Sequence, residues 1–198
     1  MAYDKFTVLK SSAVPMPIEN VDTDQIIPAR FLKATERKGF GDNLFRDWRY
    51  NSDNTPKKDF VLNNPIYSGK ILVGGKNFGS GSSREHAAWA IYDYGFRAVV
   101  SSFFADIFRN NCLNIGILPV QVSPDFLDKI FRAIESDPKT ELEVNLPEQT
   151  ITILATGESE KFEINSYKKH NLTNGYDDID YLQAMKEDIR VYAEKSIY

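Results

Sequence analysis

Short apolar runs alternate with helical patterns through the middle of the chain. From Arg84 to Tyr94, apolar residues recur at helical spacing until Gly95, a typical helix terminator, and Phe104 to Cys112 has the pattern of a second, short helix. Three apolar runs around these helices are typical of buried strands: Ile71–Gly75, Arg97–Ser102 and Gly116–Val120. Strands that alternate with helices predict a parallel or mixed sheet flanked by helices.

The pattern is less regular toward the N-terminus. Phe6 to Val14 predicts a strand and a turn that end at Pro15 and Pro17. The stretch NVDTDQIIPARFL (Asn20 to Leu32) changes from polar to apolar and predicts an irregular loop near a strand or short helix. Residues 39–59 mix aromatic side chains with Gly, Asn and Asp, which indicates an ordered but mostly nonregular excursion.

The last third of the chain predicts a helix, then strands, then a helix. Ser123-Pro124-Asp125 is a strong helix start, and the helix should run to about Glu135. Three short antiparallel strands are expected next, at Glu141–Leu146, Thr150–Leu154 and Lys161–Ile164. A helix over Asp178–Lys195 would carry Ile179, Leu182, Met185 and Ile189 on one face. The whole pattern predicts a single α/β domain over residues 1–198, with a mixed sheet flanked by helices and a C-terminal helical extension.

Composition limits the classes of function. The 198 residues are 42% hydrophobic and carry a formal net charge of -4, which argues against a nonspecific electrostatic grip on nucleic acid. No apolar run is long enough to cross a bilayer, and the first residues lack the pattern of an export signal. We therefore expect no membrane partner and a cytoplasmic location.

Cysteine and histidine are scarce. Cys112 is the single cysteine, so this chain alone forms no disulfide and holds no cysteine-based metal cluster. The two histidines, His86 and His170, lie far apart in sequence, and we predict no metal site in this chain.

The segment that is the best candidate for a functional site is GSGSSRE (Gly79 to Glu85), in which two glycines are followed by the start of a predicted helix. The N–H groups of a first helical turn and the positive end of the helix dipole attract carboxylates or phosphates. Ser82 followed three residues later by Glu85 is equally a capping box, and spacing alone favours that structural reading. The segment lacks the lysine of a P-loop and the third glycine of the dinucleotide fingerprint. The residues indicate an anion site or a capped helix.

A resemblance to a known family changes this balance. GKNFGSGSSREHAAWAIYDYGFRAVVSSFFADIFRNNCLNIGILPV (Gly75 to Val120) closely resembles the swivel domain of the aconitase superfamily, and NVDTDQIIPARFL resembles the start of that domain. DTDQIIPARFL, GFGDNLFRDWRY (Gly39 to Tyr50) and a chain that ends soon after one such domain resemble the separate small subunits of bacterial isopropylmalate dehydratases. The resemblance implies a single swivelling β/β/α domain, with GSGSSREHA as its most specific string.

That resemblance implies a hydro-lyase active only with a large subunit. Members of this family interconvert 2-isopropylmalate and 3-isopropylmalate by dehydration and rehydration, in leucine biosynthesis. The resemblance places the [4Fe–4S] cluster on the large subunit, which agrees with the single cysteine here, and it implies a small dicarboxylate substrate. A related hydro-lyase of the homoaconitase or citraconate/methylmalate type is an alternative. A non-catalytic anion-binding module and a purely structural helix cap are others.

The resemblance also assigns roles to residues. Ser82 would be the general base and later the general acid, stabilised as an alkoxide by the helix start and by Arg84. Ser83 would hydrogen-bond a substrate carboxylate, and Arg84 would pair with it. Asp24 matches an acidic position at the margin of the site, although a turn-stabilising role is as well supported. Arg30 is a second candidate carboxylate clamp, less closely matched to the family.

Other residues in these segments favour structural roles. His86 is expected on a helix beside small residues and Cys112 as a buried apolar residue, while Ser80 replaces a cysteine found in many small subunits. The aromatic segment Gly39–Tyr50 either contacts the large subunit or packs on its own domain, and the sequence favours neither.

Overall fold

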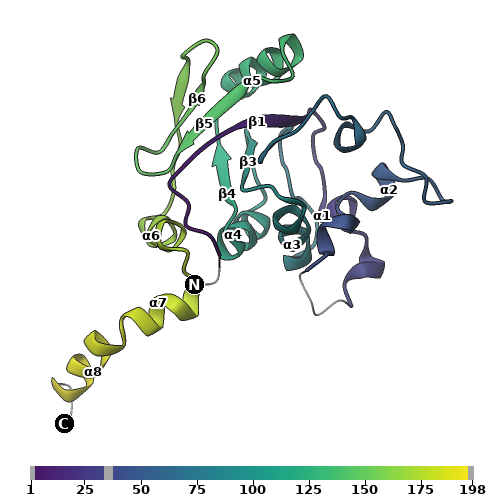
Figure 1. The fold of residues 1–198 in the computed structure, drawn as a ribbon. Helices are drawn as coiled ribbons and strands as arrows, with labels where there is room; N and C mark the ends of the chain where they lie inside the picture. Colours follow the sequence, from purple (N-terminus) through teal and green to yellow (C-terminus); the bar gives the residue numbers. More distant parts are fainter. Residues whose placement is uncertain (1–2, 34–37, 196–198) are drawn as a thin grey trace.

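The computed structural model describes residues 3–33 and 38–195, which form a mixed sheet covered by helices (Figure 1). The sheet has seven strands in the order β4-β3-β2-β1-β5-β6-β7. Their bounds are β1 Val8–Met16, β2 Ile71–Gly74, β3 Ala98–Ser101, β4 Leu118–Gln121, β5 Glu141–Asn145, β6 Thr150–Ile153 and β7 Ser159–Lys161. Strands β1 to β4 are parallel to one another, whereas β5, β6 and β7 are each antiparallel to the strand before them in the sheet order. The predicted α/β class with a mixed sheet is confirmed.

Helices cover both faces of the parallel half of the sheet. Helices α3 (Glu85–Tyr94) and α4 (Asp106–Ile115) lie on the side of β1 opposite to α5 (Pro124–Ser136) in Figure 1. The strands are therefore buried on both faces, and their sequences read as continuous apolar runs rather than as an alternation. Two hydrophobic clusters form the core, and the buried hydrophobic side chains of β2 and β3 alternate between them along each strand.

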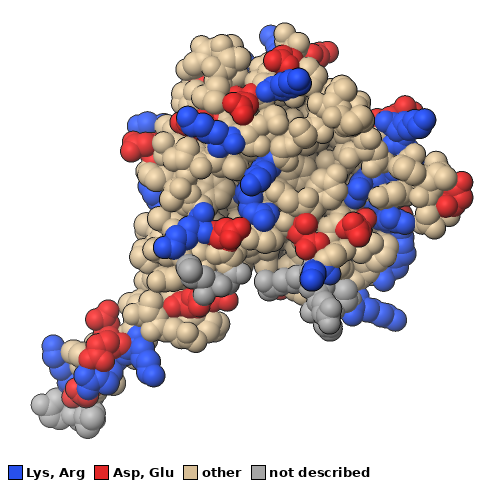
Figure 2. Space-filling model, in the orientation of Figure 1, with Lys and Arg blue, Asp and Glu red and all other residues tan. Residues whose placement is uncertain are grey.

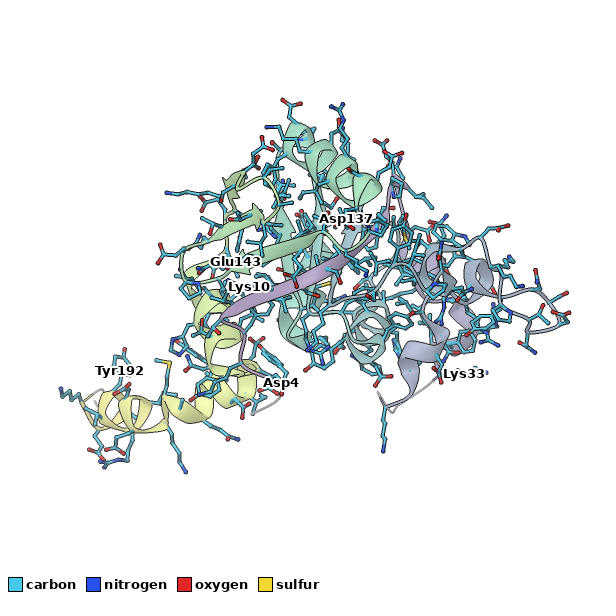
Figure 3. The ribbon with its side chains drawn as sticks, turned by 45° about the horizontal axis from the view of Figure 1, so that its top comes forward. Asp4, Lys10, Lys33, Asp137, Glu143 and Tyr192 are labelled. Carbon is cyan, nitrogen blue, oxygen red and sulfur yellow. The ribbon has the colours of Figure 1, made fainter. Side chains whose placement is uncertain are left out.

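Strand β1 changes partner along its length. Residues Val8–Ser12 pair with β5, and Ala13–Met16 pair with β2. Lys10 on β1 and Glu143 on β5 lie side by side across the antiparallel pair, with 2.8 Å between Nζ and Oε2 (Figure 3). The strand extends past the predicted segment Phe6 to Val14, because Pro15 pairs with Val73 within it, and it ends at Met16, just before Pro17. At Pro15, β1 pairs with β2 but not with β5, so the N–H that proline lacks is not needed for pairing with a second strand.

The remaining helices are short or lie near the C-terminus. Helix α5 begins as predicted, with Ser123 as N-cap accepting a hydrogen bond from the Phe126 N–H. Helix α6 was not predicted at all: its sequence SYKKHNLTN is almost entirely polar. The bounds of the remaining α-helices are α1 Thr23–Ile26, α2 Arg46–Arg49, α6 Ser166–Asn174, α7 Asp178–Ala184 and α8 Lys186–Lys195. Among the described residues, 3-10 helices lie at Ala29–Phe31, Phe40–Asn43 and Val61–Asn63.

Several predicted boundaries are wrong for identifiable reasons. Helix α4 begins at Asp106 rather than at Phe104, because Phe104 forms a β-bridge with Phe78. Strand β7 ends at Lys161, where the predicted strand begins, because its pairing with β6 ends at that residue. The predicted single C-terminal helix is two helices that meet at Met185.

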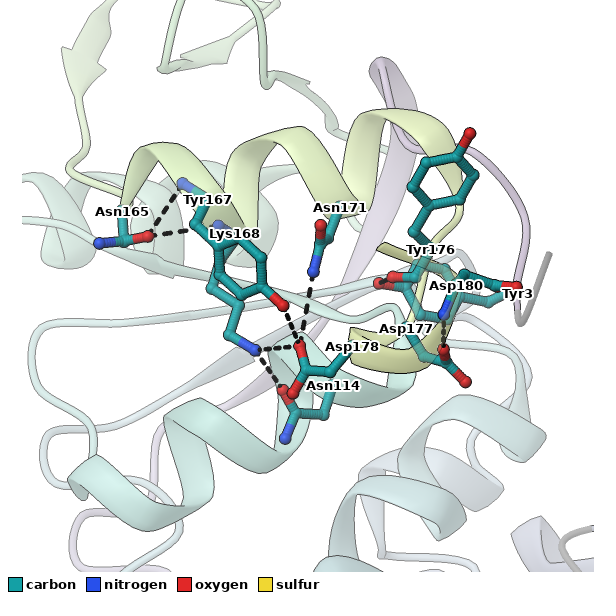
Figure 4. A network of polar contacts seen from close by, with 10 residues as sticks. All are labelled: Tyr3, Asn114, Asn165, Tyr167, Lys168, Asn171, Tyr176, Asp177, Asp178 and Asp180. Atoms are coloured by element: carbon teal, nitrogen blue, oxygen red, sulfur yellow. Dashed lines mark hydrogen bonds and ion pairs between the residues drawn. The ribbon is translucent and has the colours of Figure 1, made fainter. Parts of the chain in front are cut away.

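The C-terminal extension, α7 and α8, projects from the rest of the chain (Figure 1). Acidic and basic side chains are interspersed over it (Figure 2). The Asp178 carboxylate holds its base, accepting hydrogen bonds from Lys168 Nζ at 2.9 Å and from the Tyr167 hydroxyl at 2.8 Å (Figure 4). The Tyr167 ring also meets the Tyr181 ring edge-on at 4.6 Å. These contacts hold the start of α7 against α6, and so fix where the extension begins.

We expect Lys168→Met to loosen the extension without unfolding the domain. The hydrogen bond from Lys168 is the main cause that lowers the pKa of Asp178. The contribution is therefore present above the ordinary aspartate pKa and is lost as the pH falls through the lowered value. Because Asp178 is half exposed, the free energy of unfolding should change by less than about 1 kcal/mol.

Amide hydrogen exchange measures this directly. Protection factors over residues 178–195, which are corrected for the intrinsic exchange rate at each pH, should fall in Lys168→Met at pH 7 and in the unmodified chain near pH 3. Lys129→Met is the matched control, because Lys129 pairs with Glu158 elsewhere on the surface. Unchanged exchange in Lys168→Met would mean that the tyrosine contacts hold the extension without the ion pair.

Candidate active site

The GSGSSRE loop lies at the carboxyl edge of the parallel strands, where loops that follow β1 and β2 are joined by backbone hydrogen bonds. The N–H groups of Gly79 and Ser80 donate to the Val21 carbonyl at 2.7 and 3.1 Å, and the Thr23 N–H donates to the Ser80 carbonyl at 2.9 Å. Asp22 and Ser80 form an isolated parallel bridge. The segment before α1 thus extends the sheet and serves as a template for the loop.

Thr23, in α1, holds the second half of the loop through a hydrogen bond to Ser82. Its hydroxyl donates to the Ser82 carbonyl at 2.9 Å, and the residue is 2% exposed. Thr23 is held in turn because Asp22 and Gln25 form a true capping box at the start of α1, with both hydrogen bonds at 2.9 Å. Sequence reasoning missed Thr23, although the spacing of Asp22 and Gln25 was a signal for this capped turn.

Gly79 fits a position that no other residue fills easily. Its φ is +78°, and a Cβ there would lie 2.1 Å from the Phe108 ring on α4. Phe108 also contacts Phe78 edge-on at 5.6 Å. The close approach of the loop to α4 therefore requires glycine, and it fixes the loop on the face of the sheet that α3 and α4 cover.

The predicted capping role of Ser82 is wrong. Helix α3 begins at Glu85 and its N-cap residue is Arg84, whose side chain makes no capping hydrogen bond. Ser82 and Ser83 precede the helix and are exposed. The tether from Thr23 to the Ser82 carbonyl holds this residue in the loop instead of at the cap. The Ser82 hydroxyl is therefore not engaged as a helix cap, and the residue is exposed.

Arg84 connects the serine loop to α1. Its guanidinium forms an ion pair with Asp24, and its side chain is 15% exposed whereas that of Asp24 is 53% exposed. The structure thus brings together four of the predicted site residues: Asp24, Ser82, Ser83 and Arg84. Two exposed hydroxyls beside a mostly buried guanidinium can bind a small carboxylate by charge-assisted hydrogen bonds.

Arg30 is directed elsewhere in this structure. Both of its terminal nitrogens donate to the Asp47 carboxylate, and its guanidinium lies 4.7 Å from the centre of the Phe31 ring. The hydrogen bond to Asp47 is the main cause that raises the pKa of Arg30. A role for Arg30 as a second carboxylate clamp stays a prediction, and it requires exchange of Asp47 for substrate.

The single cysteine is unsuited to hold a metal cluster. Cys112 is fully buried in the core on α4, and burial raises the pKa of its thiol far above the ordinary value. A thiolate is the form that binds iron, so this position does not fit a cluster ligand. Over residues 3–33 and 38–195, no cluster of three or more His, Cys, Asp and Glu side chains is arranged to hold a metal ion.

The neighbouring aromatic residues pack within the chain. His86 lies 4.4 Å from the Trp89 ring and 5.7 Å from the Phe40 ring, measured between ring centres, in agreement with its structural assignment. Phe45 is buried and stacks on Trp48 at 5.5 Å. The structure therefore favours internal packing for the aromatic side chains of the segment Gly39–Tyr50. In the parts of the chain that the structure describes, no helix is both long enough and apolar enough to cross a membrane.

The sheet and its carboxyl-edge loop define the class of protein. Residues 3–125, more than half of the chain, match the family model of the aconitase C-terminal domain, and residues 128–166 match the model LeuD_N. A crystal structure of 3-isopropylmalate dehydratase (leuD) from Methanocaldococcus jannaschii superimposes with a TM-score of 0.67 and 26% identity, covering 96% of this chain and 99% of that chain.

Bacterial relatives narrow the assignment. The 3-isopropylmalate dehydratase small subunit of Cytophaga hutchinsonii is 65% identical over 98% of this chain and 97% of its own length. That of Christiangramia forsetii is 60% identical over 97% of this chain and 94% of its own length. The chain belongs to the family of 3-isopropylmalate dehydratase small subunits.

Proposed function

We propose that this chain supplies the serine–arginine half of the active site of a 3-isopropylmalate dehydratase, whose other half lies on a large subunit. The observation that carries the proposal is the placement of Ser82, exposed and tethered through its carbonyl, in the loop that leads to Arg84. Its relatives bear the name of this enzyme's small subunit. The reaction interconverts 2-isopropylmalate and 3-isopropylmalate in leucine biosynthesis, and its place of action is the cytoplasm.

Arg84 and Ser83 bind the substrate. A planar guanidinium pairs with a carboxylate through two parallel hydrogen bonds, and low solvent exposure strengthens them. Asp24 holds Arg84 in place before substrate arrives. The incoming carboxylate joins this pair or replaces Asp24, and the exposed Ser83 hydroxyl donates a further hydrogen bond to it.

Ser82 moves the proton. Dehydration removes hydroxide from one carbon and a proton from its neighbour, and the Ser82 oxygen takes that proton. In rehydration, hydroxide adds to the carbon that lost the proton, and the Ser82 hydroxyl returns the proton to the carbon that lost hydroxide. A serine oxygen is a weak base, so negative charge on it must be stabilised, and Arg84 and the positive end of α3 are the groups available for this. Since Ser82 is not the cap of α3, Arg84 takes the larger share.

The large subunit completes the site. A [4Fe–4S] cluster, when bound there, supplies the Lewis acid that assists departure of hydroxide. This chain has one cysteine and it is buried, so the cluster ligands come from the other polypeptide. Such division of the site explains why the serines of the isolated chain lie on an open surface.

Reconstitution tests the proposal. The chain and its cluster-loaded large subunit are mixed without oxygen, and the unsaturated intermediate is followed by absorbance with isopropylmalate, homoaconitate and citraconate in parallel. We expect turnover of isopropylmalate by the mixture and none by either subunit alone. Faster turnover of homoaconitate or citraconate would assign the chain to a related hydro-lyase. Carboxylate binding by this chain with no turnover in the mixture would identify a non-catalytic module.

A further inference from the structure

A group of exposed apolar residues lies on the same edge of the sheet as the serine loop. Its members are Ile18, Phe103 and Ile107, which are 43%, 48% and 51% exposed. Ile18 follows β1, whereas Phe103 and Ile107 lie after β3, in the loop and in the first turn of α4. We call these three residues the edge patch. Isolated exposed apolar residues are ordinary, so their significance depends on whether they adjoin one another.

Backbone contacts join the edge patch to the loop that leads into the serine site. The Ser101 hydroxyl donates to the carbonyls of both Gly75 and Phe103, at 2.7 and 2.9 Å. The Ile18 carbonyl approaches Gly75 so closely that a Cβ on that glycine would lie 2.4 Å from its oxygen. The N–H of Phe78, the residue before Gly79, donates to the Phe103 carbonyl at 3.1 Å. The loops that follow β1, β2 and β3 are therefore held together at this edge of the sheet, and the loop after β2 continues into the serine site.

We propose that the edge patch is a docking contact for the large subunit, an inference that rests on the proposed function. The partner must cover the exposed serines at this edge to complete the site, and the segments that carry the edge patch are in contact with the loop that leads to those serines. Partly exposed apolar and aromatic side chains form the energetic centres of protein interfaces, and charged residues lie around them. A second copy of this chain seated here would instead close the serine site to any partner.

The other exposed apolar face lies farther from the site. On the C-terminal extension, Ile179 and Leu182 are 61% and 53% exposed. The extension is anchored where Lys168 meets Asn114, in the last turn of α4, whereas Ile107 lies in the first turn of that helix. A helix of ten residues separates the two ends by roughly 15 Å. The two apolar faces can therefore be tested independently.

Titration of this chain into a fixed amount of cluster-loaded large subunit tests the proposal. For the double variant Phe103→Ser/Ile107→Ser, we expect the half-saturating concentration to rise at least about tenfold, with turnover at saturation within about twofold of the unmodified chain. The matched control is Ile179→Ser/Leu182→Ser, which removes apolar side chains that are somewhat more exposed and should leave both quantities unchanged. Thermal unfolding confirms that each variant is folded, and the single variant Phe103→Lys replaces the edge-patch double variant if that one is not.

The outcomes separate the docking role from other roles. An unchanged half-saturating concentration in the edge-patch variant overturns the proposal. A rise caused by the extension variant alone assigns docking to α7 and α8, and a fall in saturated turnover alone assigns the edge patch to the reaction; either result overturns it. Sedimentation of the mixed subunits measures association without turnover, so failure of the proposed function and failure of the edge patch are distinguishable.

Discussion

Replacement of Ser82 by alanine should lower kcat by about 10³-fold, because the reaction loses the group that removes and returns the proton. This factor corresponds to about 4 kcal/mol in the barrier. The fold should not change: the Ser82 side chain is exposed, and the hydrogen bond that holds the residue uses its carbonyl, which alanine retains. The measurement is turnover of isopropylmalate at saturating large subunit, together with sedimentation of the complex.

Ser80→Ala is the matched control for this experiment. Ser80 lies in the same loop, but its hydroxyl makes only long contacts, of 3.4 and 3.5 Å, to the carbonyls of Asn20 and Val21. We expect near-normal kcat for this variant. If Ser82→Ala kept normal turnover, the proton would be handled by another residue, and the serine–arginine mechanism would have to be abandoned.

The arrangement of strands and helices could be predicted because each element of the parallel half carries its own signal. The strands are buried on both faces, so β2, β3 and β4 lie in continuous apolar runs. Helix α5 begins with a serine cap followed by proline, and its apolar residues face the core. These signals are local, so a single sequence reveals them.

The errors had two causes, a distant contact that overrides the local pattern and a helix whose apolar pattern is weak. Ser82 and Glu85 have the spacing of a capping box, but Thr23 binds the Ser82 carbonyl from about sixty positions earlier in the chain and keeps the serine out of the helix. Helix α6 has little apolar periodicity, and its signal was the cap: the Asn165 side chain accepts hydrogen bonds from two N–H groups of the first turn. Attention to capping residues alone would have located this helix.

The extension shows a different limit of sequence reasoning. The spacing of Ile179, Leu182 and Ile189 correctly predicted helical structure, and such a stripe ordinarily packs on a core. All three side chains are at least half exposed here. Tyr192 likewise lies on α8, away from the sheet (Figure 3). Periodicity shows that a helix has an apolar face, but it does not show which surface covers that face.

Arg84→Lys should lower kcat/KM by about 10²-fold, mainly through a higher KM. The Arg84 side chain is only 15% exposed, so little solvent is available to compensate for a lost hydrogen bond. A lysine ammonium keeps the charge but presents a single point in place of a planar fork, and the second hydrogen bond to the carboxylate is lost. Steady-state kinetics at saturating large subunit separates the change in KM from any change in kcat.

Two further variants determine whether this loss belongs to the clamp. Arg132→Lys, on the exposed side of α5, should leave both constants unchanged. Asp24→Asn removes the charge that pairs with Arg84 and keeps the shape of the side chain. If Asp24 only holds the guanidinium until substrate arrives, this variant should bind isopropylmalate no more weakly than the unmodified chain, because the substrate no longer competes with it. A higher KM would instead place Asp24 among the groups that orient the bound substrate, and an unchanged KM in Arg84→Lys would remove the arginine from the clamp altogether.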